Sequence, residues 1–189
     1  MSRCAGIGCE VIIALAFGCP LEGEIHEDAV IQLSGELGEL GYTEIGVADS
    51  IGVANPRQVT RLMSRLRRSY PQVHFSAHFH NTRGLGLANV LGALEAGIDE
   101  FDSSLGGLGG CPVVPGATGN IATEDLVNCL EEMGIATGIS IAGVTSATRK
   151  MQAFLGRSLE SYVADAGSKK ELFARIAHRT SSEVSQGGH

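Results

Sequence analysis

The chain has 189 residues, of which 43% are hydrophobic and 26 are glycine, and it contains no tryptophan. This length supports one domain with a substantial core and is too short for two large domains. With 14 basic and 21 acidic residues, the formal net charge is -7 at pH 7. An acidic surface of this kind argues against nucleic acid or an anionic membrane as the partner.

Targeting signals and transmembrane segments are not recognisable in the sequence. No apolar run reaches the roughly 18 residues that a membrane-spanning helix needs. Met1 to Cys4 is not followed by the apolar core and cleavage site of a signal peptide. The five cysteines are odd in number and form no Cys-x-x-Cys pair, so we expect free thiols in a reducing compartment. These features predict a cytoplasmic protein.

The first half of the chain alternates between strand-like and helix-like patterns. Residues 11–17 form a continuous apolar run that predicts a strand buried on both faces. Helical spacing follows over 27–40, with Gly41 as the expected stop. A second strand is predicted over 43–48, and it ends at Asp49.

Asn55 and Pro56 are a helix N-cap and a first-turn proline, and they predict a helix that reaches Tyr70. A third strand is expected over 73–80. A third helix follows over 86–96, so the alternation continues without a break.

A fourth strand is predicted over 98–105, and a glycine-rich loop follows it. Thr123 offers a capping hydroxyl for a helix that ends near Met133. Three further helical segments are expected: 140–155, 159–164 and 169–177. The small polar residues of 179–189 predict a disordered tail, which leaves 1–178 as the folded domain.

Strands that alternate with helices at this spacing imply parallel βαβ units, and chemistry in such folds gathers at the carboxyl ends of the strands. Asp49, His78, His80 and the loop over 106–111 all lie at predicted strand ends. This coincidence predicts a functional site there and favours an enzyme.

His78 and His80 are two residues apart in a predicted strand, so both imidazoles should lie on the same face. Together with the amide oxygen of Asn120 they would form part of a shell for a divalent metal. Each residue also has a simpler interpretation, because a His-x-His pair can be an ordinary polar face and Asn120 can cap a turn. His74 lies deeper on the same face, and we expect it to be packed or hydrogen-bonded.

Cys111 ends the glycine-rich run, where there is little core for a small hydrophobic side chain to fill. We therefore expect it to serve as a mobile acid or base. Cys19 shares the Gly-Cys-Pro setting, and its role stays open. Asp49 is expected in the site, with a helix cap as the alternative. The remaining cysteines are expected to be structural: Cys4, Cys9 and Cys129.

Five blocks of the sequence resemble the 3-hydroxy-3-methylglutaryl-CoA lyases of the DRE-TIM metallolyase superfamily: 16–23, 49–53, 78–82, 101–112 and 119–126. The resemblance implies a (β/α)₈ TIM barrel that binds Mg²⁺ or Mn²⁺. The implied reaction splits an acyl-CoA substrate into acetyl-CoA and a keto acid. The implied metal ligands are His78, His80 and Asn120, the implied proton shuttle is Cys111, and Asp49 would lie near the substrate.

Two departures from the family pattern stand out. Asn81 replaces a common aspartate and Arg83 a common tyrosine, so Arg83 could contact a different acyl or phosphate group. The chain also shows about four βα units with C-terminal helices, whereas the barrel has eight. The Arg-Asp pair that the family carries at its first strand has no counterpart, so the chain resembles the C-terminal half of a lyase.

Three hypotheses follow. The leading one is cleavage of 3-hydroxy-3-methylglutaryl-CoA to acetyl-CoA and acetoacetate, and a close alternative is the same chemistry on citramalyl-CoA. The third is an inactive half-barrel remnant with weak metal affinity and no turnover. Four βα units expose two sheet edges, which predicts a homodimer or pairing with an N-terminal half.

Overall fold

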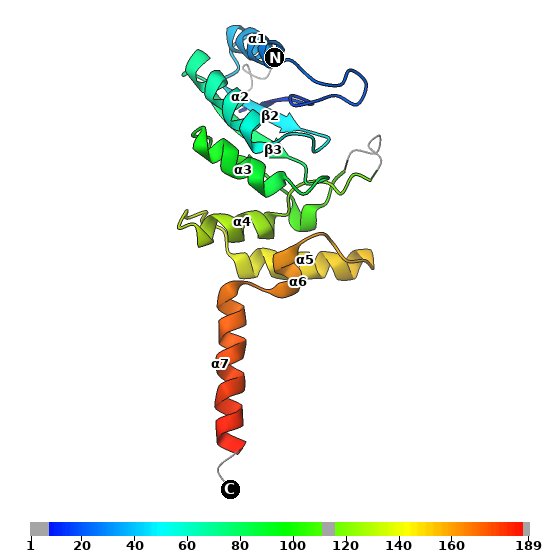
Figure 1. The fold of residues 1–189 in the computed structure, drawn as a ribbon, viewed down its shortest axis with the longest axis vertical. Coiled ribbons are helices and arrows are strands. Elements are labelled where there is room, and N and C mark those ends of the chain that lie inside the picture. Colours follow the sequence, from blue (N-terminus) through cyan, green and yellow to red (C-terminus); the bar gives the residue numbers. More distant parts are fainter. Residues whose placement is uncertain (1–7, 111–115, 187–189) are drawn as a thin grey trace.

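The computed structural model describes residues 8–110 and 116–186, with side chains as far as residue 178. Its sheet has four parallel strands in the order β1-β2-β3-β4. The strands are β1 (Val11–Ile13), β2 (Glu44–Asp49), β3 (His74–Phe79) and β4 (Phe101–Asp102). They are connected by α1 (Glu27–Glu39), α2 (Pro56–Ser69) and α3 (Gly86–Glu95), which cover one face of the sheet (Figure 1). This sequential parallel order, with a helix after each strand, is the arrangement of a TIM-barrel segment.

The core lies between the sheet and these helices. α2 places four apolar side chains at helical spacing on one face, and all four are 0% exposed: Val59, Leu62, Met63 and Leu66. They pack in one cluster with alternate residues of β2 and β3: Ile45, Val47, Phe75, Ala77 and Phe79. Because side chains alternate along a strand, this burial assigns the intervening positions of β3 to the opposite face.

The start of α2 confirms the predicted cap. The side chain of Asn55 accepts a hydrogen bond from the backbone N–H of Gln58 at 3.0 Å, and Pro56 occupies the first turn. Gly92 of α3 lies so close that a Cβ there would be 2.7 Å from the carbonyl oxygen of Pro56. The hydroxyl of Thr60 donates to the carbonyl of Gly92 at 2.9 Å, which ties the two helices together.

Both outer strands are shorter than predicted. β1 stops at Ile13 instead of residue 17 because Leu15 adopts a left-handed conformation, with φ of 58°. β4 has two residues where 98–105 was expected. The chain turns away from β3 at Ser104, whose N–H donates to the carbonyl of Ile121 at 3.2 Å.

The C-terminal part begins with a 3₁₀ turn, η2 (Leu105–Gly107), and continues with α4 (Thr123–Glu132), α5 (Ile141–Leu155) and α6 (Tyr162–Ala166). Thr123 was expected to cap α4, and this is wrong. Ala122 occupies the N-cap position without a side-chain bond, and the hydroxyl of Thr123 lies 2.9 Å from that of Ser103.

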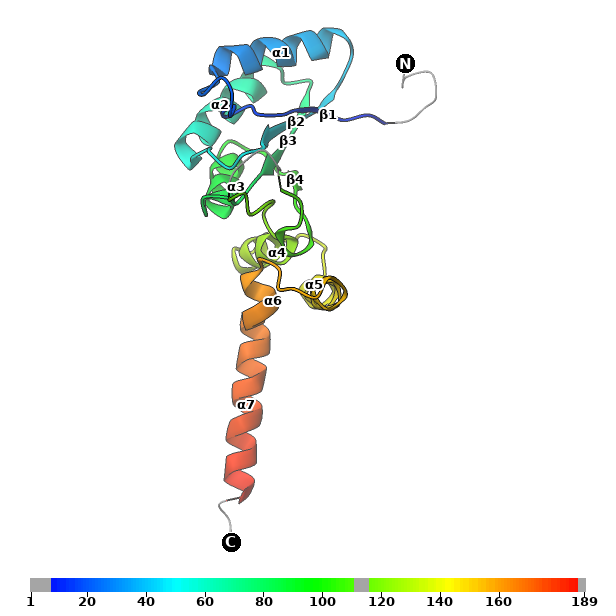
Figure 2. The ribbon, with the colours of Figure 1, turned by 90° about the vertical axis from the view of Figure 1, so that its right-hand side faces the viewer.

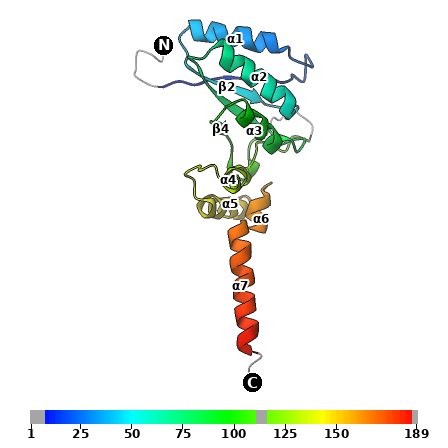
Figure 3. The same cartoon turned by 60° about the vertical axis from the view of Figure 1, so that its left-hand side comes forward.

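The last helix, α7 (Lys169–Gln186), projects away from the rest of the chain (Figures 2 and 3). Its backbone is helical through residue 186, and residues 187–189 lie outside the described part; the disorder expected over 179–189 stays a prediction. Extending an existing helix costs much less than nucleating one, so polar residues can continue a helix that begins before them.

Two expectations about the chain as a whole can be compared with the described residues. Of the helices within them, none is both long and apolar enough to cross a membrane. The cysteines described there are free thiols, as predicted: Cys9, Cys19 and Cys129. Cys4 and Cys111 lie outside the described residues.

A candidate metal centre at the carboxyl ends of the strands

His78 and His80 lie together at the carboxyl end of β3, as the strand alternation predicts. Their ring centroids are 5.2 Å apart, and the ring planes are inclined by 55°. Nδ1 of His78 lies 3.7 Å from Oδ2 of Asp102 on β4. His80 is 9% exposed, and its Nδ1 is buried without a hydrogen-bond partner among the described residues.

Backbone pairing places Asn120 beside His80. It forms an isolated antiparallel bridge with His80, and the N–H of Ile121 donates to the carbonyl of Phe79 at 3.1 Å. Its Nδ2 donates to the carbonyl of Leu108 at 2.7 Å. Its Oδ1 is buried and has no hydrogen-bond partner in the described part of the chain. Two buried acceptors, one imidazole nitrogen and one amide oxygen, are therefore left unsatisfied around this bridge.

The electrostatics keep His80 in its neutral form. Burial lowers the pKa of His80, repulsion from His78 lowers it further, and the carboxylate of Asp49 opposes both effects. A neutral imidazole is the form that binds metal ions. The ring is therefore prepared for coordination at neutral pH.

These residues fit part of a divalent metal shell. Buried polar groups are normally hydrogen-bonded, so unsatisfied ones require an explanation, and a cation is one partner that an imidazole nitrogen or an amide oxygen can bind. The residues described in the structure contain no group of three or more His, Cys, Asp or Glu side chains that could hold a metal. A metal shell built on the two imidazoles and the amide oxygen therefore needs further donor atoms from outside the described residues. Cys111 lies outside the described residues, so its role stays a prediction.

Asp49 binds the loop that follows β2 and does not cap a helix, since the N-cap of α2 is Asn55. Its side chain accepts the N–H of Val53 at Oδ1 and the N–H of Ala54 at Oδ2, both at 2.9 Å. The residue is 1% exposed. Asp49 thus holds the loop between β2 and α2, next to His80, and a direct catalytic role for it stays a prediction.

We expect Asp49→Ala to lower the free energy of unfolding by about 2–4 kcal/mol, because two buried N–H groups lose their acceptor. Asp49→Asn, which keeps one acceptor oxygen, should lose about half as much. Urea denaturation of both variants measures the effect. Equal stability of Asp49→Ala and the wild type would contradict the role of Asp49 in holding this loop.

Asn81 and Arg83, the two residues that differ from the family pattern, both make local hydrogen bonds. Oδ1 of Asn81 accepts the N–H of Gly86 at 3.0 Å, at the start of α3, a bond that an aspartate could also accept. One guanidinium nitrogen of Arg83 donates to the carbonyls of Ile51 and Gly52 at 3.0 and 3.1 Å. Arg83 therefore joins the loops that follow β2 and β3. His74, at the other end of β3, is exposed, and its Nε2 lies 2.6 Å from a carboxylate oxygen of Glu100.

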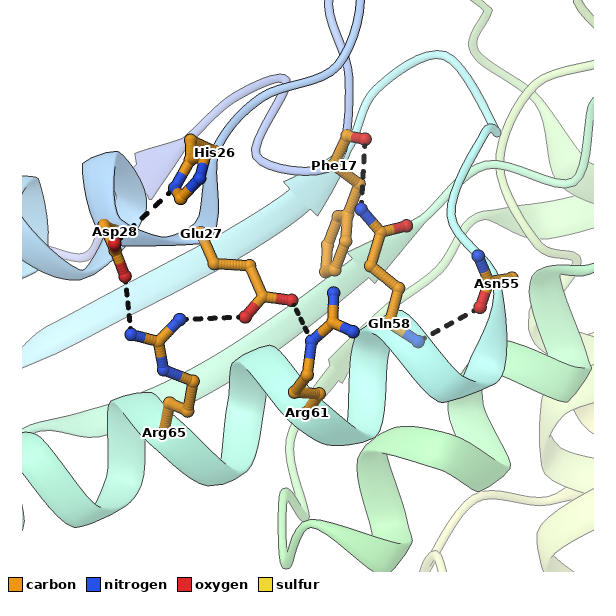
Figure 4. Close-up of polar contacts among 8 residues, drawn as sticks. All are labelled: Phe17, His26, Glu27, Asp28, Asn55, Gln58, Arg61 and Arg65. Atoms are coloured by element: carbon orange, nitrogen blue, oxygen red, sulfur yellow. Dashed lines mark hydrogen bonds and ion pairs between the residues drawn. The ribbon is translucent and has the colours of Figure 1, made fainter.

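A pocket of about 850 Å³ lies between α2 and the segment that leads from β1 into α1. Figure 4 shows that Glu27 forms ion pairs with two arginines of α2 at this pocket. Nε of Arg61 lies 2.6 Å from one carboxylate oxygen and Nη1 of Arg65 lies 2.9 Å from the other. His78, His80 and Asn120 do not line this pocket. We interpret the ion pairs as a link between α1 and α2, separate from the metal centre.

Glu124 is a buried acid that the sequence reasoning did not single out. Its side chain is 0% exposed, and both carboxylate oxygens lie 3.1 Å from the N–H of Gly106. Acids in the first turn of a helix are common, and most interact with the helix dipole at the surface. Sequence position alone therefore gives no sign that this carboxyl group turns inward.

Burial raises the pKa of Glu124, and the N–H of Gly106 partly offsets this effect. The folded state then binds the proton more tightly than the unfolded state, whose pKa is near 4.5. Stability from this group is therefore fully present below that pH and is lost as pH rises through the raised pKa. We expect Glu124→Gln to gain stability relative to wild type as pH rises from about 4.5 to about 8. Urea denaturation across this range checks the trend, and a constant difference would contradict it.

Comparison with known proteins assigns the family. Residues 5–151 match the model of the HMGL-like family. The hydroxymethylglutaryl-CoA lyase YngG of Bacillus subtilis is 42% identical over 157 residues, which are 83% of this chain and 52% of that protein. The (R)-citramalyl-CoA lyase of Chloroflexus aurantiacus is 41% identical over 162 residues, with 86% of this chain and 51% of that protein covered.

Solved structures agree with the sequence relatives. The HMG-CoA lyase from Acenitobacter baumannii, in complex with coenzyme A and 3-methylmalate, superposes with a TM-score of 0.80 at 48% identity. The match covers 85% of this chain and 52% of that one. The chain thus spans about half the length of the relatives it matches, and its four parallel strands correspond to about half of their TIM barrel. From its sequence and its fold alike, this chain belongs to the HMGL-like family.

Proposed function

We propose that this chain supplies the histidine–asparagine part of an active site that cleaves 3-hydroxy-3-methylglutaryl-CoA to acetyl-CoA and acetoacetate. The observation that carries the proposal is the pair of unsatisfied acceptors, Nδ1 of His80 and Oδ1 of Asn120, beside a second imidazole. His78, His80 and Asn120 would hold Mg²⁺ or Mn²⁺ there. The cation would supply Lewis acidity toward the substrate hydroxyl.

The reaction needs four changes in the substrate. The tertiary hydroxyl loses its proton, the C2–C3 bond breaks, C3 becomes the ketone of acetoacetate, and the electron pair passes to C2 as the enolate of acetyl-CoA. That enolate then takes a proton at carbon. A thiol acid suits this last step, and we assign it to Cys111 at the end of the glycine-rich loop.

The surrounding residues position this chemistry. Asp49 fixes the loop after β2, and Arg83 binds the same loop from the segment after β3. Fixing the loops at the barrel mouth limits the freedom of bound substrate, which is a large part of enzymatic rate enhancement.

Citramalyl-CoA is a second candidate substrate. The citramalyl-CoA lyase relative is 41% identical to this chain, and the hydroxymethylglutaryl-CoA lyase relative is 42% identical. Sequence similarity therefore favours neither thioester. Both substrates carry a tertiary hydroxyl β to the thioester carbonyl, and the same bond changes apply, with C3 of citramalyl-CoA becoming the ketone of pyruvate.

Activity measurements test the proposal. The chain is assayed alone and co-expressed with the half of the Bacillus subtilis relative that the match leaves uncovered, with each thioester and Mn²⁺ or Mg²⁺. We expect acetyl-CoA release by the co-expressed pair, with loss in His78→Ala and His80→Ala. A chain inert toward both thioesters in every combination, and unable to bind Mn²⁺, would support the remnant hypothesis. Size-exclusion chromatography of the chain alone tests the expected homodimer.

A further inference from the structure

A buried carboxyl group from α4 caps the 3₁₀ turn η2. Gly106 is the second residue of that turn, and an N–H at the start of a helical turn has no partner within the turn. Glu124 supplies the missing acceptor, with both carboxylate oxygens 3.1 Å from the N–H of Gly106. The side chain is 0% exposed. A buried carboxyl group needs a hydrogen-bond partner, and the N–H of Gly106 is that partner.

Gly106 is held through its backbone alone. It has φ of 58°, and a Cβ there would lie 2.5 Å from Cβ of Leu159. Its carbonyl accepts the N–H of Glu160 at 3.1 Å. Since Gly106 has no side chain to anchor it, the peptide contacts on both sides decide where the turn lies.

The residues that follow this 3₁₀ turn hold Asn120. The N–H of Leu108 donates to the carbonyl of Leu105 at 3.1 Å, which closes the turn. The carbonyl of Leu108 accepts from Nδ2 of Asn120 at 2.7 Å and also from the hydroxyl of Ser104. The carbonyl of Gly109 accepts the backbone N–H of Asn120 at 3.1 Å. The position of Leu108 therefore decides which end of the Asn120 amide is engaged and leaves the oxygen unsatisfied.

We propose that Glu124 is a positioning residue for the candidate metal centre. By accepting the N–H of Gly106 it fixes the turn over 105–109, and the turn holds the Asn120 amide with its oxygen free for a cation. The inference rests on the proposed function in one respect, which is the assignment of Asn120 as a ligand. The fixing of the turn and of the amide is independent of any metal.

The neighbouring acid provides a matched control. Asp125 is 8% exposed and belongs to the same turn of α4. Its carboxylate accepts the hydroxyl of Ser161 at 3.1 Å and the N–H of Val163 at 2.8 Å, which connects α4 to α6. Asp125→Asn weakens a buried contact of the same helix and leaves the acceptor of the Gly106 N–H in place. Glu124→Gln keeps a carbonyl oxygen for Gly106, whereas Glu124→Ala removes the acceptor.

Hydrogen exchange measured by NMR on the metal-free chain gives the first readout. We expect exchange of the Gly106 N–H and of the Asn120 side-chain NH₂ to accelerate about tenfold or more in Glu124→Ala. Glu124→Gln and Asp125→Asn should stay within about twofold of wild type at these two groups. Unchanged exchange in Glu124→Ala would overturn the inference. If that variant does not fold, Glu124→Asp withdraws the carboxylate by one methylene and should give the same result.

Mn²⁺ titration gives the second readout. Loss of a residue that orients a metal ligand typically weakens metal affinity about 10- to 100-fold, and we expect this range for Glu124→Ala. Faster exchange together with wild-type Mn²⁺ affinity would overturn the positioning role. If no form binds Mn²⁺, the wild type and the co-expressed pair included, the exchange pattern still decides whether Glu124 positions Asn120, and the proposed function is what fails.

Discussion

Replacing His80 by alanine is expected to weaken Mn²⁺ binding by at least about 100-fold. Losing a group that only orients a metal ligand costs about 10- to 100-fold, so losing a ligand should cost at least the upper end of that range. His80 is also the histidine whose burial lowers its pKa and leaves Nδ1 without a partner among the described residues. Isothermal titration calorimetry with Mn²⁺ at neutral pH measures the change.

His74→Ala is the matched control for this measurement. His74 lies on the same strand, but it is exposed and paired with Glu100 at the opposite end. We expect its Mn²⁺ affinity to stay within about twofold of wild type, since it contributes no ligand. Equal affinities of His80→Ala and wild type would remove His80 from the metal centre. A similar loss in both variants would point to a general effect on β3.

Replacing Phe79 by alanine should have the largest effect on stability among the residues at the site. Phe79 is 0% exposed, and its ring centroid lies 6.1 Å from that of Phe17. Truncating a buried phenylalanine typically lowers the free energy of unfolding by about 3–5 kcal/mol. Total stabilities are about 5–15 kcal/mol, so this variant should be partly unfolded under mild conditions. Urea denaturation followed by circular dichroism measures the loss.

Phe79→Leu keeps most of the buried volume and should lose less than about 1.5 kcal/mol. Phe79 lies between His78 and His80 in sequence and faces the helices, so both variants also test how the histidines are held. We expect Mn²⁺ affinity of Phe79→Leu to stay near wild type. Equal stability of Phe79→Ala and Phe79→Leu would mean that this side of β3 does not anchor the strand.

Local sequence patterns predicted the elements that carry strong signals. The apolar spacing of α2 and its Asn55 cap depend only on neighbouring residues, and both were confirmed. The predicted lengths of β1 and β4 were too long, because the length of a strand depends on the strand that pairs with it. Apolar composition could not reveal the left-handed Leu15 or the turn at Ser104.

Part of the candidate site could likewise be predicted from local patterns, and part could not. The alternation of a strand placed His78 and His80 on one face, since that follows from backbone geometry alone. For Asp49 the sequence left a site role and a helix cap open, and the structure shows bonds to the loop N–H groups of Val53 and Ala54 instead of a cap. A residue's hydrogen-bond partners come from the tertiary fold, so residue type alone could not choose between these roles.

The βα alternation, the family and the placement of two imidazoles on one strand face could all be predicted from the residues of the chain. Each of these follows from periodicity and motif, which are properties of the chain. The folded structure was needed to show that Asn120 forms a bridge with His80 and leaves its amide oxygen unsatisfied, and that Glu124 turns inward to Gly106. The side chains of Asn120 and Glu124 bind backbone groups 12 and 18 positions away, and a backbone group is the same in every residue type, so the sequence does not signal it as a partner.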